Sequence, residues 1–144
     1  MALVHTRGGT KKQHQRAQMI TIWAAYELMH KKMADNIVVN IEFKQLDAAE
    51  GFCIWSDDNL NPREFDIEIN KTLKGDDFDT CIMHEMVHVK QYAKNELRER
   101  YKGGHVQYWK KRKYIHSEYS KQPWEIEAYK LQEVLLEKLK NDGW

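Results

Sequence analysis

The sequence has few of the residues that mark secreted or membrane proteins. Only two cysteines, Cys53 and Cys81, and two prolines occur in 144 residues, which excludes a disulfide-rich scaffold. No apolar run approaches the ~18 residues of a membrane-spanning helix. The first 16 residues contain no apolar segment of the kind that a signal peptide needs. We therefore expect a cytoplasmic protein with no membrane contact, in which both cysteines are free thiols.

The chain also carries little net charge. It has 23 basic and 22 acidic residues and a net charge of +1, so no overall field favours nucleic acid or a membrane surface. With 42% hydrophobic and 31% charged residues, the composition is typical of a globular domain. We expect a flexible basic tail over residues 1–14, with weak nucleic-acid contact as the alternative to plain disorder, and one domain over residues 15–144.

The most informative segment is 79–92, which contains the pattern His-Glu-x-x-His at His84, Glu85 and His88. On a helix, two histidines four residues apart lie one above the other on one face, where both imidazoles can bind a single Zn²⁺. The glutamate between them can reach a water in the same site and act as general base. The spacing therefore predicts a zinc site with His84 and His88 as ligands and Glu85 as the catalytic residue.

Hydropathy patterning around this motif predicts an α+β domain. We expect an amphipathic N-terminal helix, a three-stranded antiparallel sheet, the motif helix, a basic irregular segment and a C-terminal helix that begins at Pro123. The expected ranges are 15–34 for the first helix, 37–43, 51–56 and 63–70 for the strands, 76–97 for the motif helix, 98–122 for the irregular segment and 123–140 for the last helix. The strand at 63–70 alternates cleanly and is a candidate edge strand for holding an extended peptide, although a plain structural strand explains it equally well.

A catalytic zinc needs a third protein ligand and an open position. We favour Glu125, because the first turn of the last helix fixes its direction and Ala128 lets the two helices approach closely. Glu127 points about 200° away around that helix and is less favoured. His105 after a Gly-Gly pair is the main rival, and His116 and Cys53 are further candidates. Cys81, one turn before His84, is interpreted as a core thiol.

The segments HEMVHVKQ and QPWEIEAY together resemble the small zinc metallopeptidases of the zincin class, in particular short SprT-like and phage-encoded metallopeptidases. They also resemble the gluzincin pattern, in which a later helix carries Glu-x-x-Ala. That resemblance implies a zincin-like fold, Zn²⁺ as cofactor, ligands His84, His88 and Glu125, and Glu85 as base. The SprT-like pattern instead implies a histidine as third ligand, which Gly104-His105 followed by Trp109-Lys110 partly matches. The chain has no Cys-x-x-Cys pair and so lacks the zinc ribbon of many SprT relatives.

Three functions are consistent with these residues. The first is a zinc peptidase acting on a peptide or protein, with Tyr114, Tyr119, His105 or His116 as the oxyanion donor. The second is a catalytically inactive zincin-fold module that binds DNA or a protein partner through the basic segment 98–122. The third is a deformylase-like hydrolase with Cys53 as ligand. Motif and resemblance favour the first.

Overall fold

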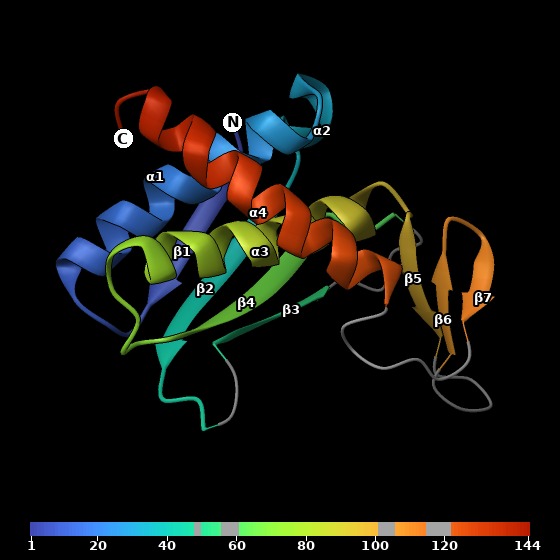
Figure 1. The fold of residues 1–144 in the computed structure, drawn as a ribbon, viewed down its shortest axis with the longest axis horizontal. Helices are drawn as coiled ribbons and strands as arrows, with labels where there is room; N and C mark the ends of the chain where they lie inside the picture. The colour runs from blue at the N-terminus through green and yellow to red at the C-terminus, as the bar shows by residue number, and fades with distance from the viewer. Residues whose placement is uncertain (48–49, 56–60, 101–105, 115–121) are drawn as a thin grey trace.

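The computed structural model describes residues 1–47, 50–55, 61–100, 106–114 and 122–144. Within these ranges the α+β class is confirmed: four helices accompany a mixed four-stranded sheet and a small antiparallel three-stranded sheet (Figure 1). The strands are β1 (Leu3–Arg7), β2 (Val38–Lys44), β3 (Gly51–Trp55), β4 (Glu64–Asn70), β5 (Leu97–Arg100), β6 (Val106–Trp109) and β7 (Arg112–Tyr114). The helices are α1 (Lys11–Leu28), α2 (Lys31–Asp35), α3 (Gly75–Ala93) and α4 (Pro123–Asn141). No helix of these described ranges is long and apolar enough to cross a membrane.

The larger sheet differs from the predicted antiparallel three-stranded sheet. Its strand order is β1-β2-β4-β3, with parallel pairing of β1 with β2 and of β2 with β4, and antiparallel pairing of β3 with β4. The parallel β1–β2 pair requires a crossover, which α1 and α2 provide. β4, the candidate edge strand, is an inner strand, and the edge strands are β1 and β3.

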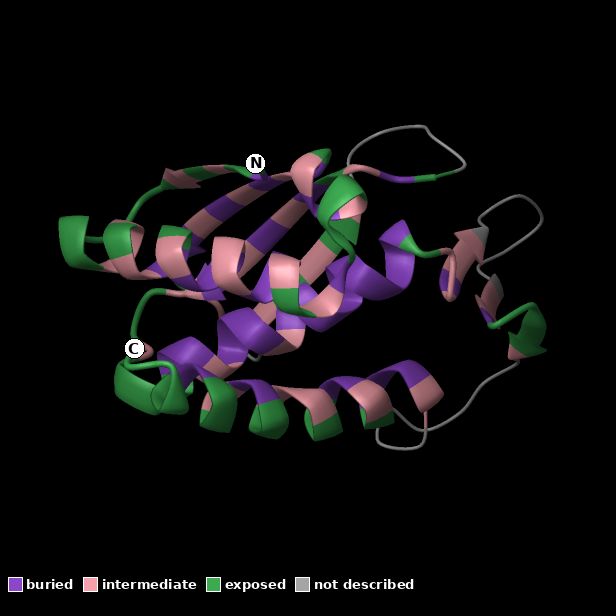
Figure 2. Ribbon diagram, turned by 90° about the horizontal axis from the view of Figure 1, so that it is seen from above, coloured by how far each residue is buried: buried purple, intermediate pink, exposed green. Residues whose placement is uncertain are grey.

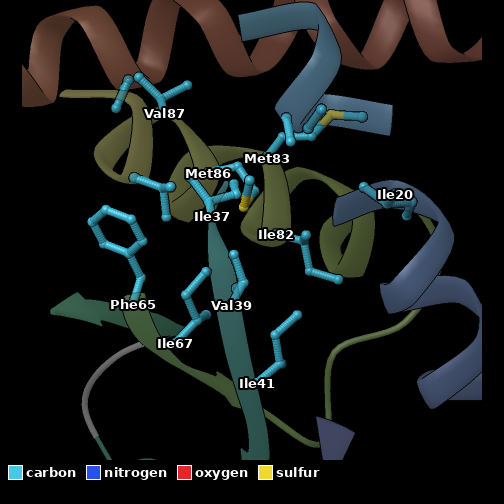
Figure 3. Packing of buried hydrophobic residues seen from close by; sticks show 14 of the residues in the cluster. Ile20, Ile37, Val39, Ile41, Phe65, Ile67, Ile82, Met83, Met86 and Val87 are labelled. Atoms are coloured by element: carbon cyan, nitrogen blue, oxygen red, sulfur yellow. The ribbon is translucent and has the colours of Figure 1, made fainter. Parts of the chain in front are cut away.

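Alternation along β2 and β4 places the core on one face of this sheet. Val39, Ile41 and Phe43 are buried and lie in register with Phe65, Ile67 and Ile69, as the pattern of the last strand predicted. The intervening side chains are polar, and on that face the Asn40 amide donates to Asp66 at 3.0 Å. Figure 3 shows Val39, Ile41, Phe65 and Ile67 of the sheet below Ile82 and Met86 of α3, and Ile20 of α1 belongs to the same buried cluster.

The helices form two layers above this apolar face. α1 and α3 cover the sheet, and α4 lies along the outer side of α3, running in the opposite direction (Figure 1). α3 is buried over most of its length because it lies between α1 and α4 (Figure 2). α3 ends at Ala93 rather than at residue 97, because Asn95 takes a left-handed conformation with φ of 59°.

The N-terminal residues that were expected to form a tail are part of the fold. β1 pairs with β2 from Leu3 to Arg7, and Ala2 is buried. Gly8 then has a φ of 75°, and a Cβ there would lie 2.4 Å from the carbonyl oxygen of Phe43, so the turn needs glycine. Thr10 and Gln13 form a capping box, and α1 therefore begins at Lys11 instead of residue 15.

The segment 98–122, predicted as irregular, contains β-structure in the residues that are described. β5, β6 and β7 form an antiparallel sheet, and Lys110 and Lys111 make the two-residue turn between β6 and β7 with φ values of 48° and 74°. Its aromatic side chains pack against the start of α4: the ring centroids of Trp109 and Tyr114 lie 6.3 Å and 5.7 Å from that of Trp124.

Candidate metal centre

Two histidines of α3 face α4 one helical turn apart. The Nε2 atoms of His84 and His88 lie 3.3 Å apart, and their side chains are only 12% and 10% exposed. This arrangement follows from the spacing of four residues, which puts both imidazoles on one side of the helix. The opposite side of α3 is apolar and packs in the core, so the rotation of the helix is fixed.

Glu125 completes a group of three donor atoms. Pro123 occupies the first position of α4, and Glu125 follows in its first turn, with its side chain buried. Its Oε1 lies 3.1 Å from Nε2 of His84 and 2.8 Å from Nε2 of His88. A tetrahedral ion with bonds of 2.0–2.1 Å separates its donor atoms by about 3.3 Å, so the three atoms fit the ligand set of one small cation.

The charges in this group support one another. Burial raises the pKa of Glu125, but hydrogen bonds and charge from His84 and His88 outweigh it and lower the pKa to about 2. Burial lowers the pKa of His88, whereas its hydrogen bond to Glu125 and the charges of Glu85 and Glu125 raise it, with a net upward shift. Glu125 is therefore an ionised carboxylate that attracts positive charge to the point where the two imidazoles meet.

Glu85 lies beside this group and has a different environment. One ligand atom of each of His84, Glu85 and His88 lies within 4.8 Å of the others. Burial raises the pKa of Glu85, and the neighbouring Glu125 adds to this, while His88 and His84 oppose it. Two carboxylates near each other are thus shifted in opposite directions, which suits Glu125 for holding a cation and Glu85 for accepting a proton.

The outer nitrogens of both histidines contact glutamine side chains that sequence reasoning missed. Nδ1 of His84 lies 2.8 Å from Oε1 of Gln132, and Nδ1 of His88 lies 2.8 Å from Oε1 of Gln91. The ring of Tyr129 also lies against His84 at 4.7 Å. Gln91 could have been found from its position three residues after His88 on the same helix face. Gln132 and Tyr129 come from α4, and only the packing of the two helices brings them here.

A cavity of about 610 Å³ opens onto the donor group. Its walls come from α3, the start of α4, strands β5 and β6, and the edge strand β3 at Gly51–Cys53. Gly51 allows this close approach, since a Cβ there would lie 2.9 Å from Sγ of Cys81 and 2.9 Å from the carbonyl oxygen of Glu68. The cavity therefore gives a ligand access to Glu85 and to the donor atoms along one strand edge.

The side chains of Glu127 and Cys53, the other described candidates for the third ligand, make different contacts from Glu125. Glu127 accepts hydrogen bonds from Lys90 at 2.7 Å and Gln91 at 3.2 Å. Cys53 and Cys81 line the cavity, and burial is the largest cause that raises the pKa of each thiol.

Three of the remaining candidates cannot be compared with Glu125. His105, His116 and Tyr119 lie outside the described residues. Tyr114, a suggested oxyanion donor, packs its ring against Trp124.

No protein-family profile, curated protein or solved structure was found to match this chain. The observations define a buried His84-Glu85-His88 group on a helix, which is a candidate metal-binding site. They also place Glu125, the predicted third ligand, within hydrogen-bonding distance of both imidazoles.

Proposed function

We propose that this protein is a zinc-dependent metallopeptidase of the zincin type. The observation that carries this proposal is the convergence of two imidazole nitrogens and the Glu125 carboxylate within 2.8–3.3 Å of one another, with Glu85 beside them in the same cavity. Two histidines and one carboxylate form a known ligand set of catalytic zinc, which keeps an open position for water or substrate. Bound there, Zn²⁺ would supply a Lewis acid that acidifies water and polarises a carbonyl group.

The donor set argues against the two other zinc sites considered. A purely structural site is normally closed by four ligands, commonly thiolates, and a deformylase-like site would use the thiolate of Cys53. Burial raises the pKa of Cys53 and of Cys81 in the metal-free protein, and neither thiol belongs to the group of donor atoms that converge at His84, Glu85 and His88. Oε1 of Glu125 lies 3.1 Å and 2.8 Å from the Nε2 atoms of His84 and His88, which supports Glu125 as the third ligand.

Glu85 is the proposed general base. Its raised pKa brings it closer to the working range of a group that must both take and release a proton. It would accept a proton from water as that water attacks the scissile carbonyl carbon, and then deliver the proton to the nitrogen of the departing amine. The peptide C–N bond breaks in the second step, and the carboxylate of Glu85 is restored.

A peptide or unfolded protein is the proposed substrate. β3 is an edge strand, lines the cavity through Gly51–Cys53, and exposes the side chains of Phe52 and Ile54. An extended peptide can add to such an edge through main-chain hydrogen bonds. β3 therefore takes the peptide-binding role that was first considered for residues 63–70, because β4 is paired on both sides.

The test separates chemistry from metal binding. Glu85→Gln keeps the size of the side chain but removes the proton acceptor, and Glu137→Gln makes the same change on the exposed surface of α4. Each protein is loaded with Zn²⁺, its metal content is measured by elemental analysis, and cleavage of dye-labelled denatured casein is followed. We expect equal zinc content in all three proteins and a loss of cleavage of about 10²-fold or more only in Glu85→Gln.

Two results would contradict the proposal. Cleavage by Glu85→Gln at the wild-type rate would exclude Glu85 as the base. Zinc-loaded wild-type protein that cleaves nothing would favour the inactive binding module, whose contact with DNA or a protein partner is predicted through the basic segment. Within that segment, the described basic residues Lys110, Lys111, Arg112 and Lys113 are exposed at and just after the β6–β7 turn.

A further inference from the structure

Gln91 is a fully buried polar side chain next to the metal centre. Its exposed fraction is 0%, and it lies on α3 three residues after His88. Both ends of its amide have partners: Oε1 is 2.8 Å from Nδ1 of His88, and Nε2 donates to the carbonyl oxygen of Trp124 at 2.9 Å and to Oε1 of Glu127 at 3.2 Å. A buried amide satisfied at both ends has one energetically acceptable orientation.

The partners of Nε2 decide that orientation. A backbone carbonyl and a carboxylate can only accept hydrogen bonds, so the amide NH₂ must face Trp124 and Glu127. The amide oxygen then faces His88, and because it too can only accept, Nδ1 of His88 must carry the hydrogen. A flipped amide would place its oxygen against two acceptors and its NH₂ away from them, leaving those two buried contacts unfavourable.

Glu127 is itself held in place behind Gln91. Its Oε1 accepts from Nζ of Lys90 at 2.7 Å, and Lys90 also pairs with Glu96 at 2.7 Å. The chain of contacts therefore runs from Lys90 through Glu127 and Gln91 to His88. The Gln132 amide, which contacts Nδ1 of His84, is held less firmly. It is partly exposed, and among its described contacts its Nε2 donates only to Glu133 at 3.3 Å.

We propose that Gln91 is a positioning residue that holds a hydrogen on Nδ1 of His88, so that Nε2 is the nitrogen that hydrogen-bonds Glu125 in the metal-free protein and that would be free to bind a cation there. The proton placement follows from the amide contacts alone, whereas its consequence for zinc affinity rests on the proposed function. Groups that orient a metal-binding histidine through its other nitrogen typically contribute 10–100-fold to metal affinity. Glu127, considered as a ligand from the sequence, acts in this arrangement by fixing the Gln91 amide.

The first experiment needs no metal. Ring ¹⁵N–¹H spectra of the wild-type protein, with His88 assigned by its loss in His88→Gln, should show a hydrogen on Nδ1 that exchanges slowly with solvent. Gln91→Met keeps the length of the side chain without the amide, and should shift that Nδ1 resonance and speed its exchange. Gln15→Met on the exposed side of α1 is the matched control and should change neither. A wild-type His88 without a hydrogen on Nδ1, or an unchanged resonance in folded Gln91→Met, would overturn the proposal.

The second experiment measures zinc affinity by competition with a chromophoric chelator. We expect a loss of 10–100-fold in Gln91→Met, a smaller loss in Gln132→Met and none in Gln15→Met. Equal affinity in Gln91→Met and wild type would refute the positioning role. If wild-type protein binds no zinc, the proposed function fails, and the ring spectra still decide the protonation of His88. If Gln91→Met does not fold, the wild-type spectrum alone remains decisive.

Discussion

One face of α3 presents Ile82, Met83 and Met86 to the core above the sheet (Figure 3). Another face presents His84 and His88 to α4. The first face needs only apolar side chains of suitable size. The second buries polar groups, which is costly unless each has a partner. Those partners are Glu125 and Gln132 of α4 and Gln91 of α3 itself, so the polar face depends on a second helix in a way that the apolar face does not. The two faces should therefore respond differently to substitution.

Breaking the apolar face should have the largest effect. Met86 is fully buried, and Met86→Ala would leave a cavity between α3 and the sheet. We expect the free energy of unfolding to fall by about 2–5 kcal/mol, measured by urea denaturation. A loss below about 1 kcal/mol would show that the core collapses around the site more readily than this packing suggests.

Breaking the polar face should affect metal binding more than stability. Glu125→Gln keeps the shape of the side chain but removes the charge that faces both imidazoles. Because it alters a proposed ligand and not its support, we expect zinc affinity to fall by more than about 100-fold. Calorimetric titration of the metal-free protein would measure this, and near-native affinity would point to another third ligand, such as His105.

Gly51→Ala tests the place where α3 packs against the edge strand β3, which we propose binds the substrate. The added Cβ would lie 2.9 Å from Sγ of Cys81 and from the carbonyl oxygen of Glu68, so β3 and α3 must move apart. We expect a loss of stability of about 1–3 kcal/mol and slower hydrolysis, followed by thermal unfolding and the casein assay. Unchanged hydrolysis in a stably folded variant would mean that the spacing between β3 and Glu85 is not critical.

The carboxylate of Asp35, which lies far from both faces of α3, should have the smallest effect on stability. Hydrogen bonds from Lys31 and Tyr26 are the largest causes that lower the pKa of Asp35. A carboxyl whose pKa is lower in the folded protein stabilises it above the unfolded pKa, and this contribution disappears as the pH falls through the folded value. Asp35→Asn should therefore be slightly less stable than wild type at pH 7, and the difference should shrink on acidification. A difference independent of pH between 7 and about 2 would contradict this origin.

The strongest periodic patterns predicted much of this fold. Phe65, Ile67 and Ile69 alternate as expected in β4, α4 begins at Pro123, and α3 carries both histidines. β1 was missed because Leu3–Arg7 is short, mixed in polarity and close to a run of lysines, and its strand character comes from pairing with β2. The β6–β7 turn was missed because Lys110 and Lys111 lack the glycine or asparagine that usually marks such turns.

In the candidate site, too, the residues with a local sequence pattern could be predicted, whereas those that depend on tertiary contacts could not. His84, Glu85 and His88 could be identified because their spacing on one helix expresses the chemistry directly. Glu125 was chosen from its position at a helix start, but only the packing of α4 on α3 brings it 2.8 Å from His88. The orientation of Gln91 depends on a backbone carbonyl and on Glu127, and no local pattern encodes contacts of that kind.

Trp124 joins three parts of the protein in a single residue. Its indole packs against Trp109 and Tyr114 of the small sheet, its carbonyl oxygen accepts from Gln91, and Glu125 follows it directly in the chain. Because Glu125 is the next residue along α4, the packing of the β6–β7 hairpin on this indole helps to fix the position of one donor atom of the candidate site.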